Sequence, residues 1–200
     1  MMRNVIVGGV ILAVGLSAAA CGHMADMSDS ADDRPVSAEK PFAAGGTIEM
    51  HLSGGEYEVR AGGDRVRVET RGHTGGTKVD VATEGKTATV NVSDTPHNNF
   101  HASIEVPKSA NLVIRLTAGE LRVAPISGNL DVDSTAGNVT IEVVNADDYA
   151  KVDASVKAGD LKAEAFGQTR SGLMQQIAWS GPGTHTLRAN LGAGNLIIRR

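Results

Sequence analysis

The 200-residue sequence is poor in residues that crosslink a chain or build aromatic clusters. It contains one cysteine, one tryptophan, two tyrosines and three phenylalanines. Because one cysteine forms no intrachain disulfide, the fold must be stabilised by apolar burial and backbone pairing. The 19 basic and 23 acidic residues give a formal net charge of −4. Since nucleic-acid-binding proteins carry a basic patch or stripe, we expect no nucleic-acid partner.

Catalytic constellations are also missing. No serine lies in a glycine elbow, no ordered set of Ser, His and Asp suggests a triad, and no phosphate-binding loop is present. His97 and His101 are four residues apart, but Pro96 and two asparagines beside them predict a turn. Because a zinc site needs three or four ligands, we predict no metal site, no cofactor and no enzymatic activity.

One group of carboxylates offers an alternative. Asn129, Asp131 and Asp133 share the outward face of a predicted strand whose inward residues are Leu130 and Val132. Paired carboxylates hydrolyse glycans when they are held about 5–10 Å apart across a sugar, which a sequence pair does not establish. We interpret these residues as a solvated strand face, with a β-helical polysaccharide lyase or hydrolase as the alternative.

The single cysteine, Cys21, stands where an apolar run from Val5 to Ala20 ends. Arg3 precedes this uncharged run, and Ala18 to Ala20 lead directly into the cysteine. The pattern resembles a lipobox and predicts a lipoprotein-type signal peptide over residues 1–20, with lipidation at Cys21. Ordinary signal-peptidase cleavage after Ala20 is the alternative. A retained membrane span is disfavoured because it needs roughly 20 apolar residues.

Residues 21–44 are rich in Asp, Ser, Ala and Pro and show no apolar periodicity. We predict a disordered tether there and a single domain over residues 45–200. Gly22 follows the anchor where an aspartate would resemble an inner-membrane retention signal. We therefore expect a lipid-anchored envelope protein, in the outer membrane if the host has two, with a secreted or periplasmic protein as the alternative.

Beyond residue 45, short segments alternate apolar and polar residues, which is typical of strands with one buried face. The alternating sets are Val66 and Val68, Val79 and Val81, Val90 and Val92, Ile104 and Val106, and Leu112, Ile114 and Leu116. No segment shows helical spacing over ten residues. The sequence therefore predicts an all-β domain.

A three-residue pattern recurs six times: glycine, then an acidic residue or its amide, then an apolar residue. The glycines are Gly55, Gly119, Gly128, Gly137, Gly159 and Gly194. We interpret each unit as a structural turn that leads into a strand. A period of 18–22 residues with two strands suits a β-solenoid or β-roll-like stack of two packed sheets, and an antiparallel β-sandwich is the alternative.

Two further expectations concern the C-terminal region. Trp179 alternates in phase with Ile177, so we expect it to pack near one end of the core rather than to stack on a sugar. The last strand, which contains Leu196 to Ile198, is expected to form an edge that pairs with another chain unless it is capped.

Several stretches resemble bacterial toastrack-type domains, a putative-adhesin family of β-strand repeats of unknown function. The central signature corresponds to Ile104 to Pro107, Leu112 to Ile114 and Ala118 to Val123. Val152 to Leu161, Trp179 to Gly183 and Leu191 to Leu196 are similar to the ending of members with lipoprotein-like signals. The resemblance spans residues 45–200. It implies a repetitive β fold displayed at the cell envelope and transfers no catalytic residues.

The function predicted from these features is a membrane-anchored, non-enzymatic binding or scaffold module with an envelope or surface protein or glycan as its ligand. An envelope-stress sensing module and the polysaccharide-cleaving enzyme are the alternatives. The oligomeric state has no signature in the sequence.

Overall fold

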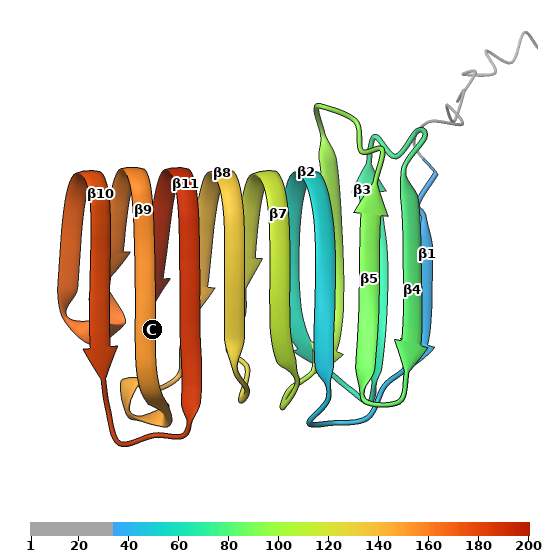
Figure 1. Ribbon diagram of the computed structural model, residues 1–200. Coiled ribbons are helices and arrows are strands. Elements are labelled where there is room, and N and C mark those ends of the chain that lie inside the picture. The colour runs from blue at the N-terminus through green and yellow to red at the C-terminus, as the bar shows by residue number, and fades with distance from the viewer. Residues whose placement is uncertain (1–33) are drawn as a thin grey trace, which may run out of the picture.

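The computed structural model describes residues 34–200, which form one wrapped sheet of 11 strands (Figure 1). The strands are β1 (Ser37–Pro41), β2 (Thr47–Gly62), β3 (Arg65–Gly72), β4 (Lys78–Glu84), β5 (Thr87–Ser93), β6 (Phe100–Pro107), β7 (Asn111–Val123), β8 (Leu130–Glu142), β9 (Tyr149–Ala163), β10 (Gln168–Ser180) and β11 (His185–Arg199). Residues 1–33, with the predicted signal peptide and Cys21, lie outside the described residues. No helix within residues 34–200 is long and apolar enough to cross a membrane.

Six long strands bend halfway and cross from one layer to the other (Figure 1). The front layer contains β4, β5 and the segments 47–52, 111–116, 130–134, 187–191, 152–156 and 175–180. The rear layer contains β1, β3, β6 and the other halves of the six strands. β2, β7, β8, β11 and β9 pair in parallel and in this spatial order. This parallel pairing confirms the solenoid-like stack of two packed sheets and excludes the antiparallel sandwich.

Glycines occupy the bends because a side chain there would strike the next coil. Gly55, Gly119, Gly137, Gly194 and Gly159 all have φ between 123° and 138°, a region that residues with a side chain rarely adopt. They pair in register along the stack. A Cβ atom on Gly137 would lie 1.8 Å from the carbonyl oxygen of Gly119. The row of bends forms one edge of the stack, which we call the glycine edge.

The glycine pattern differs from the turn-then-strand unit expected from the sequence. Five of the six glycines lie within a continuous strand, and only Gly128 precedes one, since β8 begins at Leu130. Gly128 lies in the loop between β7 and β8, where a Cβ atom would be 2.1 Å from the carbonyl oxygen of Ala110. Gly119 and Gly137 therefore mark one coil of 18 residues, and Gly128 lies halfway, at the opposite edge of the stack.

The expected C-terminal edge strand is wrong, because β11 lies inside the stack. After β8, the chain passes through a 3-10 turn at Ala146–Asp148 before β9 begins. β9 does not pair with β8, and the gap between these two strands, which we call the slot, is one strand wide. β10 then returns antiparallel to β9, and β11 enters the slot and pairs in parallel with both β8 and β9 (Figure 1). The edge strands of the described chain are instead β10 at one end and β1 and β4 at the other.

The alternating residues fill one continuous core between the layers. Every member of the five predicted sets is buried except Val79, which is half-buried. Burial raises the pKa of Tyr149 to about 12, and the nearby Asp148 adds to this shift. Trp179 is half-buried and packs against Phe166, with ring centroids 4.9 Å apart, which confirms packing near one end of the core.

The ordered domain begins before the predicted boundary at Gly45. β1 lies within the stretch expected to be a disordered tether and pairs antiparallel with β3. Phe42, immediately after β1, is buried in the core. The alternation was too short to detect here, since β1 has only five residues and mostly exposed side chains.

Candidate functional site

A polar groove runs across the outer surface of the front layer, from β5 to β9. It has a volume of about 660 Å³. Five of its lining residues come from successive coils and lie in one row: His51, Arg115, Asp133, Asn190 and Ser155. Each of these residues stands four positions before a bend glycine, so the glycine register places them side by side. We call this set the polar row.

One ion pair and two hydrogen bonds connect four members of the polar row across four coils. Arg115 Nη1 lies 3.2 Å from Oδ2 of Asp133. Asn190 Nδ2 donates to Oδ1 of Asp133 at 2.7 Å, and Ser155 Oγ donates to Oδ1 of Asn190 at 2.8 Å. These bonds fix the orientation of each side chain, so the row presents a preorganised polar surface rather than independent mobile groups.

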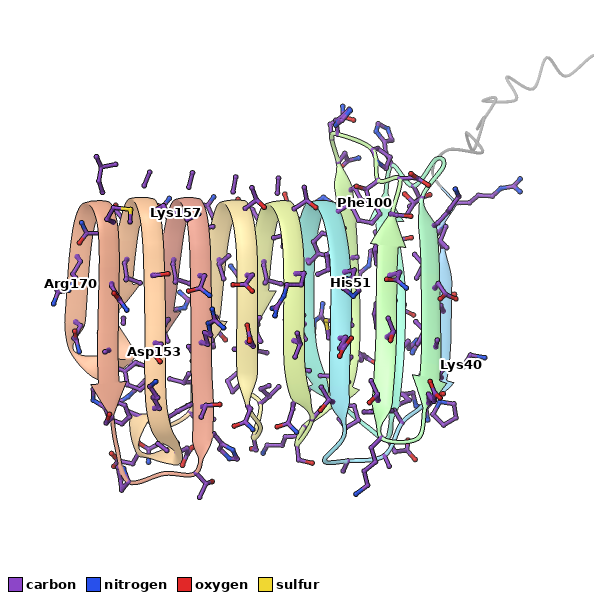
Figure 2. The ribbon with its side chains drawn as sticks, in the orientation of Figure 1. Lys40, His51, Phe100, Asp153, Lys157 and Arg170 are labelled. Carbon is purple, nitrogen blue, oxygen red and sulfur yellow. The ribbon has the colours of Figure 1, made fainter. Side chains whose placement is uncertain are left out.

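Two groups in the groove remain available to a ligand. His51 is exposed at the β2 side of the groove, and Lys157 is exposed at the β9 side, close to the glycine edge (Figure 2). Neither side chain has a hydrogen bond or an ion pair with another residue in the 34–200 range. Ser53, Thr117 and Thr135 add hydroxyl groups along the same rim. The groove therefore offers donors and acceptors at both ends and along its length.

The carboxylates singled out from the sequence are engaged with Arg115. Leu130 and Val132 are buried and Asp131 and Asp133 point outward, as predicted. Arg115 Nη1 lies 3.1 Å from Oδ1 of Asp131 and contacts Asp133 as well. Alternate residues of a strand are about 7 Å apart, so the two carboxylates lie beside each other on one strand face rather than across a substrate. Of the two, Asp133 lines the groove.

The other predicted candidates do not join this groove. Asn129 Oδ1 accepts hydrogen bonds from the backbone and the hydroxyl of Thr186, which ties β8 to the start of β11. His97 is exposed in the loop before β6, whereas His101 lies on β6 and its Nδ1 is 2.7 Å from Oε2 of Glu56. Within residues 34–200, no three metal-ligating side chains come together.

A second groove, of about 410 Å³, lies on the outer surface of the rear layer. His101 and Glu56 lie in contact in this groove, Arg60 and Glu58 form an ion pair there, and Asn138 continues its polar lining from β8. Asn195 Nδ2 donates to Oδ1 of Asn138 at 2.8 Å, which forms an amide ladder beside the bends. Asn138 Nδ2 also donates to Oε1 of Glu120 at 3.4 Å, so the residues after the bend glycines of β7, β8 and β11 connect three neighbouring coils.

Sequence reasoning missed Arg115, Asn190, Ser155, His51 and Lys157. A signal for four of them was present, because they share the fourth position before a bend glycine. This signal becomes readable only once the glycines are known to lie in register. Lys157 has no counterpart of the same charge at the corresponding position of the other coils.

Comparisons with known proteins identify the fold. No protein-family model matches the sequence, and no curated protein matches it. Among solved structures, a putative cell adhesion protein from Clostridium sporogenes is 12% identical with a TM-score of 0.51, and the match covers 83% of this chain and 99% of that chain. A putative adhesin from Bacteroides fragilis is 9% identical with a TM-score of 0.27, covering 82% and 97%. One from Parabacteroides distasonis is 10% identical with a TM-score of 0.25, covering 83% and 98%. The first match shows that this chain has the fold of a bacterial protein described as a putative cell adhesion protein.

Proposed function

We propose that this chain is a lipid-anchored envelope protein whose front groove binds an extended glycan without cleaving it. The observation that carries the proposal is the polar row, which crosses five coils and whose members on four of them are held in place by one ion pair and two hydrogen bonds. The names given to the proteins in the fold comparison agree with an adhesin-like role. The anchor is proposed from the lipobox-like sequence at Cys21.

The chemistry of the groove favours a glycan over a protein partner. Protein interfaces depend on buried aromatic or large apolar anchors. The groove exposes hydroxyl, amide, carboxylate and cationic groups instead, and its large apolar residues, such as Leu52 and Leu116, are buried in the core. Neighbouring coils are stacked about 4.8 Å apart, so the groove presents polar groups at regular intervals. This regular spacing suits the repeating sugar units of an extended glycan.

A polysaccharide lyase or hydrolase is the second candidate, because Asp133, Arg115 and Lys157 line one groove on adjacent coils. This combination of acidic and basic residues is what such an enzyme requires. Binding is favoured because Arg115 engages both carboxylates, and because Asp131 and Asp133 stand side by side on one strand face, with Asp133 alone lining the groove.

Removing His51 and Lys157, the two groove side chains without a partner, is expected to weaken glycan binding at least about tenfold, because the ligand loses a hydrogen bond to each. The variant is His51→Ala with Lys157→Ala. The matched control is His97→Ala with Lys162→Ala, which removes the same residue types from outside the groove. Binding of the mature chain to peptidoglycan sacculi and a panel of purified envelope polysaccharides would be measured by pelleting and calorimetry.

Equal binding by both double variants would contradict the groove as the ligand site, and failure of the wild type to bind any of these glycans would contradict the proposed ligand class. The same incubations would be analysed for new reducing ends and unsaturated sugars. Their appearance with the wild type and loss with Asp133→Asn would favour the enzyme instead.

A further inference from the structure

The last coil turns the glycine edge differently from the other coils. Four coils pass this edge with an alanine followed by glycine: Ala118-Gly119, Ala136-Gly137, Ala193-Gly194 and Ala158-Gly159. β10 passes it with Leu173 and Met174, and Leu173 pairs in register with Ala158. Two large apolar side chains thus stand at the end of a row that otherwise carries methyl groups.

Leu173 and Met174 are both energetically unfavourable at these positions, because of their exposure to solvent and the backbone conformation of Met174. Leu173 is 75% exposed and Met174 is 77% exposed, and Val144, at the opposite edge of the stack, is the other large apolar residue exposed to this degree within residues 34–200. Met174 also has φ of 53°, a strained conformation for a residue with a side chain. An alanine and a glycine would remove the exposure and the strain together, so the retention of Leu173 and Met174 points to a partner at this corner.

The chain enters the domain at this same edge. The hydroxyl of Thr74 donates to the carbonyl oxygen of Arg34, just beyond the end of β3. The last residue of β3, Gly72, pairs with Phe100, whose ring covers the bend at Gly55. Figure 1 shows β1 starting at the side of the stack where the long strands bend.

The linking chain is short compared with the stack. Twelve residues separate Cys21 from Arg34, which reach at most about 40 Å. The stack from β1 to β10 is also about 40 Å long, at roughly 4.8 Å per strand. A lipid on Cys21 would therefore hold the β1 end of the glycine edge within about 40 Å of the bilayer, and this tethering raises the effective concentration of any contact between the edge and lipid.

We propose that Leu173 and Met174 insert into the lipid surface and orient the stack with its glycine edge on the membrane. This inference rests on the proposed anchor at Cys21. It places the front and rear layers upright, so that the front groove opens sideways and stays accessible.

A second copy of the chain fits the corner less well than lipid. An edge-to-edge dimer through β10 would continue the core, and the inward positions of β10 pair with the buried residues Ala163, Leu161 and Val156. These three positions hold Gln168, Arg170 and Gln175, and the inward positions nearer the end of β10 hold Ile177 and Trp179. Two Arg170 side chains would thus be buried in a continued core, and inward-pointing charge is a known device against edge pairing.

The test uses the full lipidated protein in vesicles of phosphatidylethanolamine and phosphatidylglycerol that carry spin-labelled lipid. Because Cys21 is the only natural cysteine, Leu173→Cys would provide one thiol for an environment-sensitive fluorophore. The matched control is Val144→Cys, which is similarly exposed at the opposite edge. We expect the label at 173 to shift to the blue and lose most of its emission to the lipid quencher, with the label at 144 unchanged. Adding Met174→Asp should reduce the quenching at 173.

Protein that floats with the vesicles while the label at 173 stays unquenched would overturn the membrane contact and leave the anchor intact. Protein that does not float would overturn the anchor and this inference together. A blue shift at 173 that grows with protein concentration in the absence of quenching would identify a second copy as the partner, and would also overturn the proposal.

Discussion

Gly137→Ala is expected to lower the free energy of unfolding by at least about 4 kcal/mol or to prevent folding. Gly137 has φ of 123°, and an added Cβ atom would lie 1.8 Å from the carbonyl oxygen of Gly119 in the next coil. β8 is paired on both sides, with β7 and β11, so neither neighbour moves away without breaking ladder hydrogen bonds. Denaturant unfolding followed by far-UV circular dichroism would measure the loss.

Gly172→Ala is the control that separates the effect of backbone strain from the steric clash between an added Cβ atom and the neighbouring coil. Gly172 lies at the corresponding bend of β10 with φ of 121°, but an added Cβ atom there would lie 3.4 Å from a flexible glutamine side chain. This variant should lose only the conformational part, about 1–3 kcal/mol. If both substitutions had the same small effect, close approach of the coils would not be the reason for glycine at these bends.

Removing β11 is expected to abolish cooperative folding of the whole domain. A chain that ends at Thr184 leaves the slot between β8 and β9 empty and exposes two strand edges inside the stack. It also removes the buried side chains Leu187, Leu191 and Ile198 from the core. Among the strands of residues 34–200, β11 alone connects β9 and β10 to β8, so they would lose their attachment to the other coils.

The measurement is thermal and denaturant unfolding of the truncated chain, alone and with a synthetic peptide of residues 185–200. We expect no cooperative transition alone and partial recovery with the peptide, because the slot pairs with a strand in parallel on both sides. A chain that ends after Ile198 is the control and should unfold like the full domain. A cooperative transition of normal size without β11 would contradict its central position.

The strands were predictable because their signal is local. A few residues are enough to identify the buried face of a strand, as with Val90 and Val92 or Leu112 and Ile114, because side chains alternate between the two faces. β1 was missed because five residues with mostly exposed side chains carry too little pattern. The order of strands in the stack was not predictable, because neither Leu196 nor Ile198 differs locally from residues of an edge strand. The insertion of β11 into the stack depends on the gap that the loop before β9 leaves between β8 and β9.

The candidate site was predictable only in part, for the same reason. The outward direction of Asp131 and Asp133 follows from alternation, and the structure confirms it. Their partner Arg115 lies 16 and 18 residues away, and it meets them because Gly119 and Gly137 hold the coils in register. The glycines thus determine the site as well as the bends, although the sequence shows them only as turn signals.

The central proposal is an anchored binding module at the cell envelope, and one comparison tests it most directly. Cells that express the wild type and Cys21→Ser would be fractionated, the mature N-terminus analysed by intact mass, and whole cells treated with external protease. The account predicts an acylated Cys21 in the membrane fraction of the wild type, and its loss from that fraction in the variant. Protease cleavage of intact cells would further indicate display at the surface. An unmodified wild type that is soluble and unaffected by the substitution would contradict the account.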